Sequence, residues 1–104
     1  MIISTSDTIP GKEISEVLGI VKGNTVRARN LGRDLLAVIK NLIGGEIEEY
    51  TKLMAESREQ ALDRMKQMAM EMQADAVINV RFATSYIMAN AAEILVYGTA
   101  VKLK

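Results

Sequence analysis

One stretch of the sequence, residues 47–73, contains no glycine or proline and is rich in Ala, Glu, Met, Lys and Leu. These residues are strong helix formers, whereas glycine and proline interrupt helices. The stretch therefore predicts a single helix of about 27 residues, roughly 40 Å long at 1.5 Å per residue. A compact chain of 104 residues has a diameter of roughly 34 Å. The helix would project beyond its own domain unless a neighbour covered it, which predicts a homo-oligomer.

Residues 64–73 of this helix contain four of the seven methionines. Met65, Met68 and Met72 share one helix face at i, i+3 and i+7, while Met70 lies about 200° around the helix from Met68. Thioethers can bind soft ions such as Cu(I). A methionine stripe at helical spacing is more typical of core filling. We therefore expect the three to pack on a sheet and Met70 to contact a neighbouring subunit.

Strand-forming segments lie on both sides of the helix. Pro10-Gly11 fits the centre of a type II turn, and Lys22 to Thr25 is a second turn signal. A shorter helix is predicted after a cap at Asn30, ending at Gly44-Gly45. The predicted strands cover residues 2–5, 13–21, 25–29, 76–87 and 92–103.

These segments predict one α+β domain over residues 1–104, with the order β-β-β-α-α-β-β. An antiparallel sheet is packed by one long and one shorter helix. In residues 76–87 the alternating set that best suits the core is Ala76, Ile78, Val80, Phe82, Thr84 and Tyr86.

Composition excludes several function classes. The chain has no Cys and no His, which removes disulfides, thiol nucleophiles, Cys/His zinc sites and imidazole-based catalysis. Lys plus Arg (13) equals Asp plus Glu (13), and there is no Trp, so a nucleic-acid partner is not expected. The start resembles no signal peptide and no apolar run could span a bilayer. We expect a cytoplasmic protein with no membrane partner.

Two charged groups are candidate sites. Glu46 precedes the long helix, where negative charge complements the helix dipole; alternatively, Glu46 and Asp75 could supply oxygen ligands to Mg²⁺ or Ca²⁺. Arg27, Arg29 and Arg33 lie near the start of the shorter helix and could bind an anion. The alternative for these arginines is a solvated basic rim, or pairing with the acidic long helix.

Local motifs along the whole chain together resemble the YbjQ family, small bacterial and archaeal proteins often described as heavy-metal-binding. The resemblance rests on Gly44-Gly45-Glu46, Tyr50, Arg58, Ala61, Arg64-Met65, Ala74-Asp75-Ala76-Val77, Val80-Arg81-Phe82 and Tyr97-Gly98-Thr99-Ala100-Val101. It implies a dodecin-like subunit layout and a ring-shaped pentamer that shares strands between subunits. A metal ion is implied by the family description alone, and no other cofactor is evident. Asn79 stands where the family pattern expects a small residue, often glycine.

The candidate ligand-binding set is completed by four polar residues that belong with these motifs: Tyr50, Arg58, Arg81 and Glu93. Arg81, on the polar side of its strand, could pair with Glu93 on the next strand, and such pairs more often fix assembly than perform chemistry. We expect a non-enzymatic homo-oligomer that binds a metal ion or small ligand at subunit interfaces. The alternatives are an enzyme that uses Glu46, Tyr50 and Arg58, or a purely structural ring.

Overall fold

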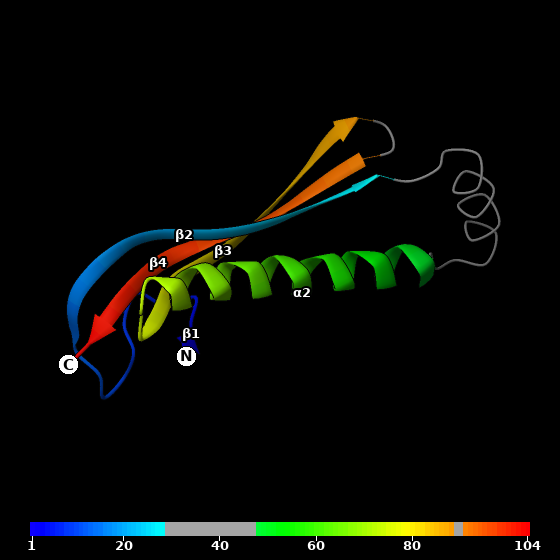
Figure 1. Cartoon of the computed structure of the whole chain (residues 1–104). Helices are drawn as coiled ribbons and strands as arrows, with labels where there is room; N and C mark the ends of the chain where they lie inside the picture. The colour runs from blue at the N-terminus through cyan, green and yellow to red at the C-terminus, as the bar shows by residue number, and fades with distance from the viewer. Residues whose placement is uncertain (29–47, 89–90) are drawn as a thin grey trace.

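The computed structural model describes residues 1–28, 48–88 and 91–104, and it confirms an α+β fold built around one long helix (Figure 1). The predicted helix before Gly44-Gly45 lies outside the described residues. The elements are β1 (Ile2–Ile3), β2 (Ile14–Ala28), α2 (Glu48–Glu71), β3 (Ala76–Met88) and β4 (Ala91–Leu103).

The sheet is mixed, so the prediction of a wholly antiparallel sheet is wrong. The strand order is β1-β3-β4-β2, and β4 runs antiparallel to both of its neighbours. The short β1 runs parallel to β3, with Ile2 opposite Ala76 and Ile3 opposite Val77. A parallel pair needs a long connection, and here β2 and α2 lie between the two strands in the sequence.

The predicted type II turn at Pro10-Gly11 is confirmed. Gly11 has a φ of 77°, which suits the third position of that turn. The Lys12 N–H donates a hydrogen bond to the Ile9 carbonyl at 3.0 Å. The turn lies in the connection that carries the chain from β1 on one edge of the sheet to β2 on the other edge, where β2 runs in the same direction as β1.

The second predicted turn, Lys22 to Thr25, is wrong, because β2 is one continuous strand through this segment. Gly23 permits close approach of the helix: a Cβ there would lie 2.1 Å from the Ala61 carbonyl oxygen and 2.5 Å from the Met65 nitrogen. A glycine inside a strand often marks such an approach of another backbone. Next to it, the buried Thr25 hydroxyl donates to the Ser57 carbonyl at 3.2 Å.

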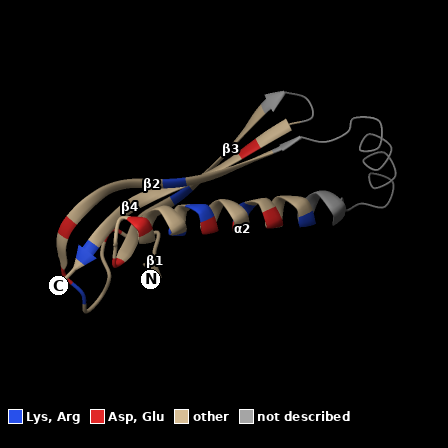
Figure 2. Ribbon diagram, viewed as in Figure 1, with Lys and Arg blue, Asp and Glu red and all other residues tan. Residues whose placement is uncertain are grey.

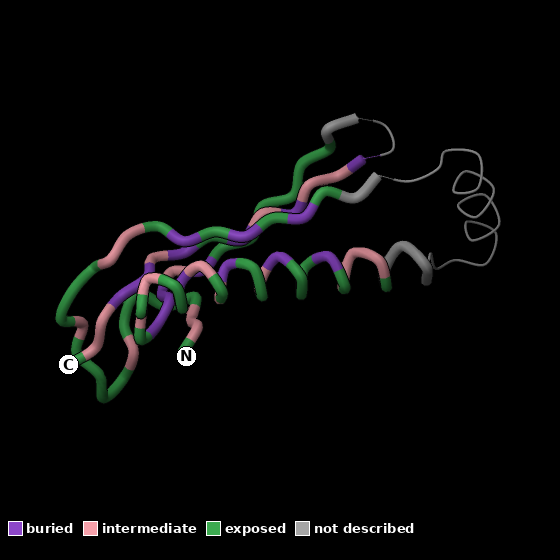
Figure 3. The backbone as a smooth tube through the Cα atoms, viewed as in Figure 1, coloured by how far each residue is buried: buried purple, intermediate pink, exposed green. Residues whose placement is uncertain are grey.

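The main core lies between α2 and one face of the sheet (Figure 3). Met65 is fully buried there, Met54, Met68 and Met72 pack against the same cluster, and Met70 is 59% exposed. This confirms the separation of the helix methionines into a core stripe and one outward side chain. The buried cluster consists of Val21, Ala61, Met65, Ala69, Val77, Val80, Ile94, Val96 and Ala100.

The molecule is elongated. Its extents are 54 × 22 × 16 Å and its radius of gyration is 17.3 Å, against roughly 13 Å for a compact chain of this length. Acidic and basic residues both occur along α2 (Figure 2). In the described ranges, no helix combines the length and the apolar character that crossing a bilayer requires.

The Gly23 contact predicts the effect of one added methyl group. Gly23→Ala should lower the free energy of unfolding by about 1–3 kcal/mol or more, because the backbone of α2 would have to move away from β2. The control is Lys22→Ala, at an exposed neighbour, which should change it by less than about 0.5 kcal/mol. Urea unfolding at fixed protomer concentration measures both. Equal stability of the two variants would contradict the close approach.

The methionine stripe gives a second matched pair. Met65→Ala should cost about 2–5 kcal/mol because it leaves a cavity in the core. Met70→Ala should cost less than about 0.5 kcal/mol, since its side chain is outside the core of the chain. Thermal unfolding followed by circular dichroism compares the two. A larger loss for Met70 would mean that the stripe is assigned to the wrong helix face.

Candidate functional site

The face of the sheet that lies away from α2, called here the outer face, is only partly covered. At one end a small buried cluster forms from Ala76, Ile78 and Val101, with Ile9 and Ile14 packed against it. Farther along, Ile20 is 71% exposed and Tyr97 is 41% exposed. Large apolar side chains exposed together on one surface are typical of interaction sites.

A β-bulge in β3 decides which side chains reach this face. Ile78 pairs with Thr99 and Arg81 pairs with Tyr97, so two residues of β3 oppose one residue of β4. The bulge reverses the alternation of side chains. Val80 enters the main core beside α2, while Ile78 belongs to the outer cluster. The residues that the sequence predicted as one core face of β3 therefore lie on two different faces of the sheet. Without the bulge, Arg81 would point into the core.

Asn79 occupies the bulge with a φ of 54°. This left-handed conformation favours glycine, and Asn is among the few other residues that adopt it readily. The glycine that the resemblance implies at this position would adopt the same conformation without strain. The N-terminal segment secures the bulge: the N–H groups of Asn79 and Val80 donate to the carbonyls of Ser6 and Ser4, each at 3.0 Å.

Arg81 is anchored to the same segment. Its Nη1 donates to the carbonyls of Thr5 and Val80, both at 2.9 Å. The predicted pair with Glu93 is wrong, because Glu93 lies opposite Ser85 and accepts a hydrogen bond from the Asn24 amide at 3.1 Å. Four residues of strand separate Glu93 from Tyr97, about 13 Å. Among the described residues, Arg81 has no carboxylate partner.

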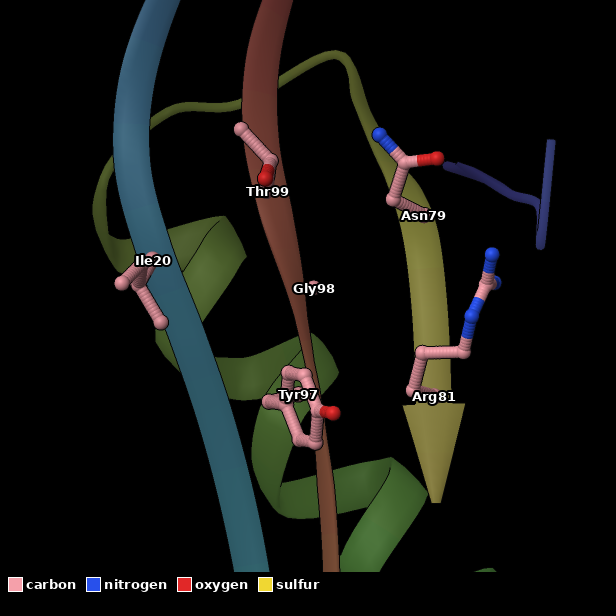
Figure 4. A pocket seen from close by; sticks show the side chains of 6 residues that line it. All are labelled: Ile20, Asn79, Arg81, Tyr97, Gly98 and Thr99. Atoms are coloured by element: carbon pink, nitrogen blue, oxygen red, sulfur yellow. The ribbon is translucent and has the colours of Figure 1, made fainter. Parts of the chain in front are cut away.

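A shallow pocket of about 350 Å³ lies on the outer face at this point (Figure 4). Gly98 lies at its centre, between the Tyr97 ring and Thr99 on β4. Ile20 of β2 borders one side, and Asn79 and Arg81 of β3 border the other. Arg81 is the one charged residue among the described residues that line the pocket, so its lining carries a formal charge of +1.

The other candidate ligand residues do not gather here. The Asp75 carboxylate accepts a hydrogen bond from the Leu103 N–H at 2.8 Å, which ties the start of β3 to the end of β4. Asp75 and Glu93 are near opposite ends of β4, and Arg58 is exposed on α2. Tyr50 is in the first turn of α2 and Arg27 is in β2. Arg29, Arg33 and Glu46 lie outside the described residues.

The side chains that the structure describes do not fit a heavy-metal site. Soft metals prefer thiolate, imidazole or thioether ligands, and the chain has no Cys or His. The described residues also contain no group of three or more Asp and Glu side chains arranged to hold a metal. The Met65 thioether is in the closed main core, with Met68 and Met72 packed against it.

Five lining residues were not selected from the sequence as ligand-binding residues: Ile20, Asn79, Tyr97, Gly98 and Thr99. Gly98 and Thr99 are in the Tyr97 to Val101 motif, but they had no assigned role. Ile20 could have been found, since Ile20 and Val21 are adjacent in a strand and must face opposite sides. One of these two apolar side chains had to lie away from α2.

The conformation of Asn79 can be tested by two substitutions. Asn79→Ala should lower the free energy of unfolding by about 1 kcal/mol, because alanine pays the left-handed penalty without the local hydrogen bonding of asparagine. Asn79→Gly should leave it unchanged or raise it slightly. Urea unfolding curves compare the three proteins. Two equally destabilised variants would show that the side chain, rather than φ, determines the stability here.

Comparison with known proteins places the whole chain in one family. The YbjQ_1 family model, described as "Putative heavy-metal-binding", matches residues 1–104. A UPF0145 protein of Methanoculleus marisnigri is 58% identical over 103 residues, covering 99% of this chain and 96% of its own length. One from Archaeoglobus fulgidus is 56% identical over 104 residues, covering 100% and 96%.

A solved structure supports the fold independently. The crystal structure of a DUF74-family protein of unknown function from Pediococcus pentosaceus superimposes with a TM-score of 0.69. The match covers 100% of this chain and 98% of the other, at 15% sequence identity. The sequence matches over the full length show that this chain belongs to the YbjQ (UPF0145) family.

Proposed function

We propose that this protein is a non-enzymatic, cytoplasmic homo-oligomer that binds a small ligand where its subunits meet. The observation that carries the proposal is the outer face of the sheet, which combines exposed apolar side chains with the pocket beside Arg81. A surface of this composition loses solvent-exposed apolar area when a second copy covers it. The family resemblance favours five subunits.

Exposed apolar side chains extend along the strands. On β2, Val17 pairs with the outer-face residue Val101, and Val17 is 64% exposed. Val26, paired with Glu93, is 53% exposed. On β3, Tyr86 is 83% exposed and Phe82, opposite the buried Val96, is 49% exposed. Val17 and Val26 therefore lie on the outer face, whereas Phe82 and Tyr86 lie on the face that carries α2, so exposed apolar side chains occur on both faces of the sheet.

The edges of the sheet support the same proposal. Within the described residues, β2 is one edge, and β3 beyond Arg81 has β4 as its sole strand neighbour. Exposed strand edges present unpaired N–H and C=O groups that another chain can bind. Pairing the β3 edge of one copy with the β2 edge of the next is a head-to-tail contact, which closes into a ring when the rotation permits.

The subunit number is tested by native mass spectrometry of the full chain. A pentamer of 11.4 kDa chains should appear at about five times that mass. Tyr86→Glu should shift the protein toward monomer, because it places a charge on the exposed end of β3. Gln67→Glu, which adds the same charge at an exposed position of α2, should leave the mass unchanged. A stable monomer of the unmodified chain would overturn the proposal.

A further inference from the structure

We propose that the outer-face pocket binds a small organic oxyanion, a carboxylate or phosphate attached to an apolar body. The inference deepens the proposed small-ligand binding by naming the ligand chemistry, and it rests on that function. Arg81 would receive the anionic group, and Tyr97 and Ile20 would contact the apolar body.

The charge of the pocket selects an anion. Arg81 carries the one formal charge among the described lining residues, and no described carboxylate neutralises it. A cation entering the pocket would meet this positive charge and no acidic ligand. The pocket is therefore unsuited to a heavy-metal cation, although the family is described as heavy-metal-binding.

The guanidinium is oriented for a two-point contact. Nη1 donates to the carbonyls of Thr5 and Val80, which fixes the plane of the group. The described residues supply no acceptor for Nε or Nη2. These two nitrogens form the fork that binds carboxylate or phosphate through parallel hydrogen bonds. Because the protein already holds the fork in place, less side-chain entropy is lost on binding.

The remaining lining fits the rest of such a molecule. The Tyr97 ring and the Ile20 side chain provide apolar surface on either side of the β2–β4 boundary (Figure 4). The Thr99 hydroxyl and the Asn79 amide add neutral polar groups, which can either donate or accept. The volume of about 350 Å³ lies at the lower end of the range for small-molecule pockets. A single aromatic or branched aliphatic acid is the appropriate size.

Isothermal titration calorimetry of the full chain tests the ligand class with three probes of similar shape. Benzoate and phenyl phosphate carry the anionic group, and benzylammonium carries the opposite charge. We expect saturable binding of at least one anion and none of benzylammonium. Tighter binding of benzoate would identify a carboxylate as the natural group, and tighter binding of phenyl phosphate would identify a phosphate ester.

Two arginine variants locate the binding. Arg81→Gln should weaken association of the tighter anion at least about tenfold, the usual effect of losing a charged hydrogen-bond donor. The control is Arg64→Gln: Arg64 is exposed on α2 and its Nη1 also donates to a backbone carbonyl, that of Asn24. It should bind as the unmodified chain does. If Arg81→Gln does not fold, Arg81→Lys replaces it, and this variant should bind several-fold more weakly because lysine lacks the fork.

The inference is overturned if neither anion binds saturably, if benzylammonium binds equally well, or if the Arg81 variant binds as tightly as the control. Native mass spectrometry of the same samples separates this failure from failure of the proposed function. An intact oligomer that binds neither anion refutes the ligand class alone. A monomer refutes assembly, while anion binding by that monomer would still support the pocket.

Discussion

The close approach of α2 to β2 at Gly23 determines how the rest of the molecule is arranged. With no side chain at this position, the helix backbone at Ala61 and Met65 lies directly on the strand. That contact places the helix over β2 and β4, and Met65 and Ala69 close the main core from above. Because α2 lies toward the β2 side, none of the described residues forms a helix above the far part of β3, and Phe82 and Tyr86 are exposed there. The exposure of Phe82 and Tyr86, on the face that carries α2, is therefore a consequence of where the helix packs.

The bulge at Asn79 and Val80 connects this packing to the pocket. A regular strand would place Val80 on the outer face and Arg81 in the core, where an unpaired guanidinium would be very costly. One additional residue in β3 exchanges their sides, so that Val80 fills the core and Arg81 lies beside Tyr97. The cost is the left-handed backbone of Asn79. The N-terminal segment stabilises that conformation through hydrogen bonds to the bulge, and the same segment anchors Arg81. One local irregularity thus serves both the core and the site.

The features that depend only on neighbouring residues, namely the long helix, the first turn and the last two strands, could be predicted from the sequence. The residues of α2 are good helix formers, Pro10-Gly11 fits its turn, and the limits of β3 and β4 agree with the structure within one residue. A turn was predicted at Gly23 because a glycine next to an asparagine is typical of turns. The same pair can also lie in a strand that a helix packs against closely, as it does here. The parallel pairing of β1 was not predicted, and the pairing of Arg81 with Glu93 was predicted wrongly, for a different reason. Both depend on the register between segments that are distant in the sequence. A bulge changes that register without a distinctive sequence signal, and Asn79 was its one visible trace.

Assembly and ligand binding should reinforce each other on the outer face. In a single chain the pocket is shallow and Ile20 is largely exposed, so water would screen the attraction between Arg81 and an anion. A second copy that covered Ile20 and Tyr97 would exclude this water and strengthen the same charge interaction. It would also leave the guanidinium buried without a counterion, which costs free energy unless an anion is present. An anion that neutralises Arg81 would therefore favour the assembled state, and by linkage the assembled state would bind that anion more tightly.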